Sequence, residues 1–212
     1  MSKQKIVIFT AISLILLFMV GGYVYKNQQS AQFSSIAQKN SEAFVREHSL
    51  TIGNKDAKVH IVEFFDPACE TCADFYPFIK DIMKKNEGNI KLTLRYAPFH
   101  QGSDHVVKML EAARKQGKFH ETLEMIFATQ SSWASHHKPN PELLWKYLAK
   151  LGLDIDKLVL DMKDPALDTL IAQDLADAKT LGATKTPSYF VNTKPLEKFG
   201  YKPLKELIYS EL

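Results

Sequence analysis

The only two cysteines of this 212-residue chain, Cys69 and Cys72, stand where a segment of strand length gives way to a helical pattern. Residues 59–65 are rich in β-branched and aromatic side chains, which favours a strand. Apolar residues then recur every three or four positions over residues 75–83, which is typical of a helix. Asp66 suits the turn between them. Cys69 is therefore expected at a helix N-terminus, where unpaired backbone N–H groups and the helix dipole stabilise a thiolate.

At helical pitch Cys72 lies one turn beyond Cys69, so the two sulfurs can close a short disulfide and open it again. A purely structural disulfide would close a loop of about four residues and contribute only roughly 2 kcal/mol. A zinc site needs about four ligands. The chain has no second cysteine pair, and its only closely spaced histidine pair is the adjacent His136 and His137. Two unreactive core cysteines would make their place at the junction a coincidence. The pattern favours a redox-active dithiol, with no metal and no cofactor.

Residues 63–72, EFFDPACETC, resemble the active-site strand and helix of the DsbA-like branch of the thioredoxin superfamily. Pro77 matches the proline that kinks the active-site helix of thioredoxins. Residues 182–191, GATKTPSYFV, resemble the segment that carries the cis-proline of that superfamily. The likeness extends over about residues 50–212. It implies an α/β thioredoxin-like fold with a helical insertion at about residues 100–182.

The resemblance also implies a role for each site residue. Cys69 would exchange with substrate thiols, and Cys72 would resolve mixed disulfides. Pro187 would be a cis-proline beside Cys69, although composition alone favours an ordinary trans proline at a strand start. The main chain of Thr186 would hold an extended substrate. Glu63 would be a buried acid that shuttles the proton of Cys72; the alternative is a carboxylate in water at a sheet edge.

One departure from the family concerns the two residues between the cysteines. Strong oxidants of the family carry Pro-His there, and this chain has Glu70 and Thr71. A carboxylate at Glu70 should raise the pKa of Cys69, so a milder oxidant is expected. Thr186 before the proline is also found in isomerase-type relatives. The principal interpretation is a dithiol oxidase, the alternative is an isomerase or reductase of the same fold, and a binding or chaperone module with an inert disulfide is the third.

Residues 6–25 carry no charge and would span ~30 Å as a helix, the thickness of a bilayer's hydrocarbon core. Lys3 and Lys5 make residues 1–5 a positive segment that stays cytoplasmic in an anchor. A cleaved signal peptide is the alternative, but its apolar region is usually only ~7 to 15 residues long. We therefore expect one N-terminal transmembrane helix that is not cleaved. The catalytic domain then lies on the periplasmic side of the inner membrane, or is secreted to the periplasm if cleavage occurs.

Residues 26–50 are polar and are expected to tether a domain at residues 51–212. The formal net charge of +3 is accounted for by Lys3, Lys5 and Lys26, so the domain is formally neutral, which argues against nucleic-acid binding. Implied partners are exported, incompletely folded proteins with cysteines and a membrane oxidase of the DsbB kind.

The remaining elements follow from periodicity. Ile90–Tyr96 alternates as a strand with one buried face. Several helices follow, among them one at residues 141–152, and their histidines, including His100, are expected to be solvated. A last edge strand is expected near residues 197–201, before a terminal helix that begins at Pro203.

Overall fold

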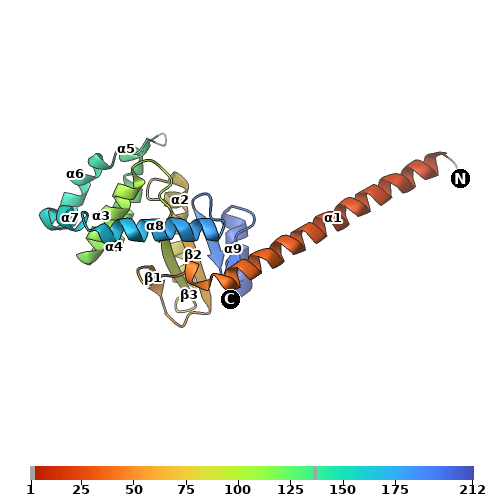
Figure 1. The fold of residues 1–212 in the computed structure, drawn as a ribbon, viewed down its shortest axis with the longest axis horizontal. Helices are drawn as coiled ribbons and strands as arrows, with labels where there is room; N and C mark the ends of the chain where they lie inside the picture. The colour runs from red at the N-terminus through yellow and green to blue at the C-terminus, as the bar shows by residue number, and fades with distance from the viewer. Residues whose placement is uncertain (1–2, 136–137) are drawn as a thin grey trace. The chain divides into compact units, whose positions relative to one another are not determined.

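The computed structural model describes residues 3–135 and 138–212 and divides into two compact units, Met1–Asn40 and Ser41–Leu212 (Figure 1). The described part of the first unit is the helix α1 (Lys3–Lys39) and Asn40. This helix includes residues 6–25 and continues through much of the segment expected to be a polar tether. Within residues 3–135 and 138–212, no helix has the length and apolar character that a membrane crossing requires.

The sheet of the second unit has the order β1-β3-β2-β4-β5. Its centre is the parallel pair β2 (Val59–Phe65) and β3 (Ile90–Tyr96). The short strand β1 (Leu50–Gly53) pairs antiparallel with β3, and β4 (Ser188–Val191) pairs antiparallel with β2. The two-residue strand β5 (Lys194–Pro195) extends the sheet beyond β4. Because β2 and β3 are parallel neighbours, the loops at their carboxyl ends lie at the same edge of the sheet.

Helices cover both faces of the central strands (Figure 1). α2 (Glu70–Lys85) contacts α9 (Tyr201–Glu211), which packs on β2 and β4. α8 (Pro165–Thr180) contacts β3 on the other face. Every residue of β3 except Lys91 is buried, so the prediction that this strand has only one buried face is wrong. A strand covered on both faces has no solvated side where polar residues would be required.

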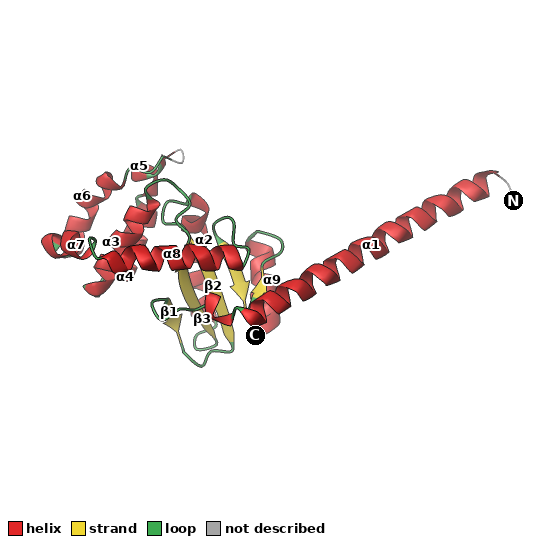
Figure 2. Ribbon diagram, in the orientation of Figure 1, coloured by secondary structure: helices red, strands yellow, loops and turns green. Residues whose placement is uncertain are grey.

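The polypeptide between β3 and β4 forms the expected helical insertion (Figure 2). Its described helices are α3 (Ser103–Lys115), α4 (Phe119–Ala128), α5 (Gln130–Trp133), η3 (Pro141–Leu144), α6 (Trp145–Leu148), η4 (Ala149–Leu151), α7 (Ile155–Asp161) and α8. The single helix expected at residues 141–152 is thus broken into 3-10 and α-helical turns. Of the histidines considered as zinc ligands, His136 and His137 lie outside the described residues.

The C-terminal elements differ from their predicted bounds. Asn192 and Thr193 have φ angles of 47° and 67°, so they form a tight turn and strand pairing resumes immediately at β5. The edge strand predicted near residues 197–201 is therefore wrong in position. α9 begins at Tyr201, so Pro203 lies in its first turn instead of starting it.

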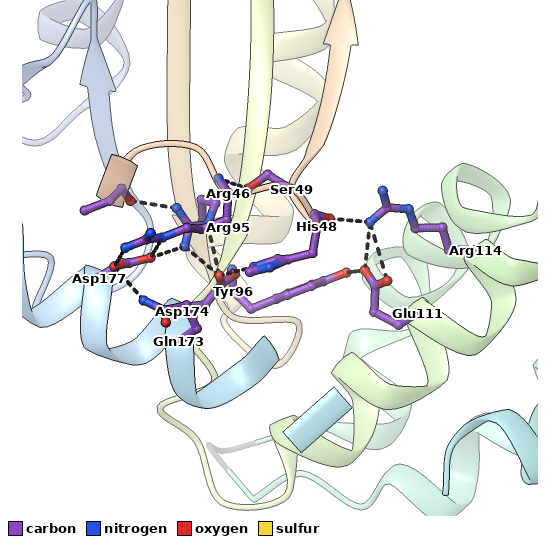
Figure 3. A network of polar contacts seen from close by, with 11 residues as sticks. Arg46, His48, Ser49, Arg95, Tyr96, Glu111, Arg114, Gln173, Asp174 and Asp177 are labelled. Atoms are coloured by element: carbon purple, nitrogen blue, oxygen red, sulfur yellow. Dashed lines mark hydrogen bonds and ion pairs between the residues drawn. The ribbon is translucent and has the colours of Figure 1, made fainter. Parts of the chain in front are cut away.

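The buried cation Arg95 lies on β3, on the face of the sheet that α8 covers (Figure 3). Its guanidinium donates to Asp174 and to Asp177, each at 2.6 Å, and both carboxylates belong to α8. The guanidinium carbon also lies 5.3 Å from the centre of the Phe64 ring. Since a buried charge is tolerated only when it is paired and hydrogen-bonded, this arrangement fixes α8 against the sheet.

The segment before β1 is attached to the same buried charges (Figure 3). The carbonyl oxygen of Ala43 accepts a hydrogen bond from the Arg95 guanidinium at 2.6 Å. Arg46 donates to Asp177 at 2.8 and 2.9 Å, and the His48 ring lies 2.6 Å from Asp174. The compact unit accordingly begins at Ser41, whereas the sequence indicated a domain start at residue 51.

Candidate active site

Cys69 is the N-cap residue of α2, and Cys72 lies in the first turn of that helix. Both are free thiols. The Cys69 side chain retains some exposure, at 7%, whereas Cys72 has none. Cys69 also contacts the cis-proline loop, because its Sγ lies 3.3 Å from the carbonyl oxygen of Thr186. The position expected from the change of periodicity, at the helix N-terminus, is therefore confirmed.

The pKa values of the two thiols are shifted in opposite directions. A hydrogen bond from the Cys72 thiol, with further bonds from the Thr186 side chain and the Cys72 backbone N–H, lowers the pKa of Cys69 to about 6 against the effect of desolvation. Burial, followed by the hydrogen bond to Cys69 and the negative charges nearby, raises the pKa of Cys72 well above its ordinary value. At neutral pH the sulfur that retains some exposure is thus the thiolate, and the completely buried sulfur keeps its proton.

Glu63 lies on the central strand β2 and is 2% exposed, so the alternative of a solvated carboxylate at a sheet edge is wrong. Its Oε1 accepts a hydrogen bond from the Tyr189 hydroxyl at 3.0 Å, and its Oε2 is buried with no hydrogen-bond partner among the described residues. Desolvation raises the pKa of Glu63 to about 8, although the bond from Tyr189 opposes this. The Glu63 charge acts on Cys72 and helps to raise its pKa. An acid with this pKa exchanges protons readily near neutral pH.

The peptide bond between Thr186 and Pro187 is cis, as the family resemblance implies. Pro187 is buried, and Thr186 is partly exposed immediately before β4. This loop lies beside Cys69, as the contact of the Cys69 sulfur with Thr186 shows. The structure therefore brings the cis-proline segment and the first cysteine together.

Glu70 is exposed and Thr71 is partly exposed on the first turn of α2. The pKa of Cys69 is lowered, and Glu70 is not among the principal causes of this shift, so the expected effect of the Glu70 carboxylate stays a prediction. The negative charge that opposes the Cys69 thiolate belongs to Asp66, which the sequence placed only in a turn. Hydrogen bonds to the sulfur outweigh this repulsion.

Asp66 is fully buried beneath the turn that precedes Cys69. Its Oδ1 accepts from the Ala68 N–H, and its Oδ2 accepts from the His100 N–H and lies against His100 Nδ1, each at 2.8 Å. The His100 side chain is only 23% exposed, so its assignment as a solvated residue is wrong. The signal that could have found this pair is the position of both residues just beyond the carboxyl ends of parallel strands.

Comparison with known proteins gives a sequence-family model, described as thioredoxin, that matches residues 45–209. The Na+/H+ antiporter NhaA of Herminiimonas arsenicoxydans is 31% identical over 144 residues, which are 68% of this chain and 22% of the antiporter. A proposed protein-disulfide oxidoreductase of Rickettsia bellii is 25% identical over 172 residues, 77% of this chain and 64% of the relative. The chain thus spans less than two thirds of either relative.

Solved structures share the fold. A thioredoxin-like oxidoreductase from Silicibacter pomeroyi superposes with a TM-score of 0.69 at 27% identity and covers 81% of this chain and 96% of its own. The thiol-disulfide exchange protein alpha-DsbA2 from Wolbachia pipientis superposes with a TM-score of 0.71 at 18% identity and covers 86% of this chain and 97% of its own.

Proposed function

The chain belongs to the thioredoxin family, and from this we propose that it is a thiol:disulfide oxidoreductase of the DsbA-like branch that acts through Cys69 and Cys72. The DsbA-like resemblance is confirmed by the family model and by the shared fold of solved relatives. The observation that carries the proposal is the difference between the two thiols. Cys69 retains a small exposed surface and is acidic, whereas Cys72 is completely buried and keeps its proton.

In the proposed reaction the oxidised protein carries a Cys69–Cys72 disulfide. A client thiolate attacks the Cys69 sulfur, the disulfide breaks, and Cys72 leaves as a thiolate that takes up a proton. A second client thiolate then attacks the client sulfur of the mixed disulfide and displaces Cys69 as a thiolate. Two electrons pass from the client dithiol to the protein, and the client gains a disulfide.

The direction of the reaction follows from the leaving group. Hydrogen bonds stabilise the Cys69 thiolate in the reduced protein, which favours reduction of the enzyme and oxidation of the client. We therefore propose a dithiol oxidase. Glu70 and Thr71, which occupy the positions between the cysteines, would tune how strongly oxidising the pair is.

Glu63 is proposed as the proton acceptor and donor for Cys72. It is buried, its charge raises the pKa of that thiol, and its own pKa of about 8 allows it to hold or release a proton during turnover. The cis-proline loop is proposed as the client-binding segment. Beside Pro187 and next to Cys69, the backbone of Thr186 would form main-chain hydrogen bonds with an extended client polypeptide. Such pairing accepts clients of many sequences.

The equilibrium between the full chain and glutathione tests the direction of the reaction. A potential near about −120 mV is expected for a dithiol oxidase. A value near about −200 mV or lower would assign the protein to isomerase or reductase chemistry. Absence of any exchange would contradict oxidoreductase function and leave the interpretation of an inert disulfide in a binding module.

Client exchange is tested with Cys72→Ser, which removes the sulfur that resolves mixed disulfides. In this variant we expect covalent complexes between Cys69 and disulfide-containing unfolded polypeptides to accumulate. The Cys69 thiolate attacks the client disulfide, one client sulfur leaves as a thiolate, and no Cys72 thiol is present to resolve the mixed disulfide. Cys69→Ser is the matched control and should trap nothing. Equal trapping by both variants would refute the assignment of Cys69 as the exchanging thiol.

We also propose that residues 6–25 anchor the protein in the inner membrane with the domain on its extracytoplasmic side. Support comes from the uncharged run and from the helix α1 that includes it. Exported proteins with cysteines would be clients, and a DsbB-like membrane oxidase would restore the disulfide. Resistance of the membrane-bound chain to alkaline extraction is the expected result, and recovery of a shortened soluble protein from the periplasm would instead show cleavage.

A further inference from the structure

The pair formed by the buried Asp66 and the partly buried His100 is not used by the reaction described above, yet it adjoins the turn that leads to Cys69. Asp66 stands three positions before Cys69, and the Cys69 N–H donates to the Asp66 carbonyl oxygen at 3.0 Å. His100 reaches this place from the loop that follows β3. The Ala97 N–H donates to the Phe65 carbonyl oxygen at 2.8 Å, so main-chain bonding ties the two loops together.

The negative charge of the Asp66 carboxylate disfavours the reactive thiolate form of Cys69. This carboxylate has no exposed surface, so water does not screen its charge, and that charge opposes formation of the Cys69 thiolate. Neither carboxylate oxygen lacks a donor. Oδ1 accepts from the Ala68 N–H, and Oδ2 accepts from the main chain and the ring of His100. A carboxylate oxygen accepts hydrogen bonds, so the ring donates to Asp66 in the tautomer whose proton is on Nδ1.

We propose that His100 is a positioning residue of the thiol exchange, which by donating its ring proton to Asp66 draws the carboxylate charge toward the β3–α3 loop and thereby keeps the Cys69 thiolate stable. The ring is the only donor to the carboxylate that comes from a side chain among the hydrogen bonds described for Asp66. It is therefore the donor that a substitution can remove while the two main-chain bonds remain. This inference rests on the proposed role of Cys69.

The decisive comparison is between His100→Leu and His100→Asn. Leucine removes the ring donor, and asparagine places an amide N–H near the position of Nδ1. With the ring donor gone and the two main-chain donors unchanged, the negative charge of Asp66 should act more strongly on Cys69 in His100→Leu. We expect the pKa of Cys69 to rise by at least about half a unit, which is a roughly threefold fall in the ratio of thiolate to thiol at a given pH, and the glutathione equilibrium to move toward the disulfide form by a similar factor. His100→Asn should restore most of both values.

His120→Gln on α4 is the matched control, because this exposed histidine leaves the carboxylate untouched and should change neither quantity. Asp66→Asn removes the charge, and in that background His100→Leu should no longer raise the pKa of Cys69. If Asp66→Asn fails to fold, the Leu and Asn pair at position 100 still decides the question. The pKa is read from the pH dependence of Cys69 alkylation in the reduced full chain.

Two results would overturn the inference. The first is an unchanged or lowered pKa of Cys69 in His100→Leu, and the second is an equal change in both His100 variants. A purely structural role would lower the melting temperature and leave the pKa and the glutathione equilibrium at their wild-type values. Failure of the proposed function is separate, because it appears as absence of client exchange in the wild-type protein, whereas alkylation measures the thiol without any client.

Discussion

Glu63→Gln is the substitution whose effect on stability follows most directly from the structure. The carboxyl of Glu63 is buried on the central strand, and its pKa rises from an ordinary 4.5 to about 8. A group that is protonated more readily in the folded state stabilises that state fully below pH 4.5. This contribution is lost progressively as the pH rises through about 8, since ionisation then occurs inside the protein.

The magnitude follows from the two pKa values. At about 1.4 kcal/mol for each pKa unit, their difference corresponds to roughly 4 to 5 kcal/mol of unfolding free energy lost between acidic pH and pH 9. Glutamine has the same shape and cannot ionise, so Glu63→Gln should lack this slope. Tyr189 can donate to the amide oxygen as it does to the carboxylate.

The assay is urea unfolding of the oxidised protein between pH 4 and pH 9, where the disulfide prevents Cys69 and Cys72 from titrating. Between pH 5 and pH 8, the free energy of unfolding of the variant should rise relative to that of the wild-type protein by up to about 1.4 kcal/mol per pH unit. Glu70→Gln is the control, because an exposed carboxylate should change stability by no more than about 0.5 kcal/mol at any pH. A difference between wild type and Glu63→Gln that does not vary with pH would refute the reasoning.

Other substitutions test the neighbouring interactions. Tyr189→Phe removes the donor to a buried carboxylate and should cost about 1 to 3 kcal/mol of unfolding free energy at neutral pH; no loss would show that the bond is unimportant. Cys72→Ala removes the largest stabilising contact of the thiolate, so the pKa of Cys69, followed by thiolate absorbance, should rise from about 6, and a fall would contradict the assignment. Asp174→Asn breaks a fully buried ion pair and should cost about 3 to 5 kcal/mol in chemical unfolding, whereas the exposed Asp168→Asn should cost less than about 1 kcal/mol; similar losses in both would exclude the buried network as a source of stability.

The parts of the site that the sequence predicted correctly are local in the chain. The change from a strand pattern to a helical pattern places Cys69 at the N-terminus of α2, because both patterns lie within a few residues of the cysteine. The cis bond at Pro187 was predicted only through resemblance, since composition alone favours trans. The burial of Glu63 was also implied by resemblance, and the structure supplies its reason, a central strand covered on both faces.

The contacts that the sequence did not predict join residues far apart in the chain. Tyr189 pairs directly with Glu63 across β4 and β2, but the register of two strands separated by the whole insertion cannot be read from periodicity. Arg95 alternates with apolar residues on β3, a pattern typical of an outward-facing side chain. Only the position of α8 on that face makes it buried, and only the carboxylates of α8 make its burial tolerable.

From the attachment of residues 41–49 to the buried charges we also expect a particular point of entry for mechanical load. Any pull transmitted along the polypeptide from α1 enters the second unit at Ser41 and meets the contacts of Ala43, Arg46 and His48 with the charged groups beneath them. These contacts lie on the α8 face of the sheet, whereas α2, with the thiols at its start, packs on the other face. We therefore expect a force applied through α1 to act first on the α8 face, away from the helix that begins beside the reactive sulfur.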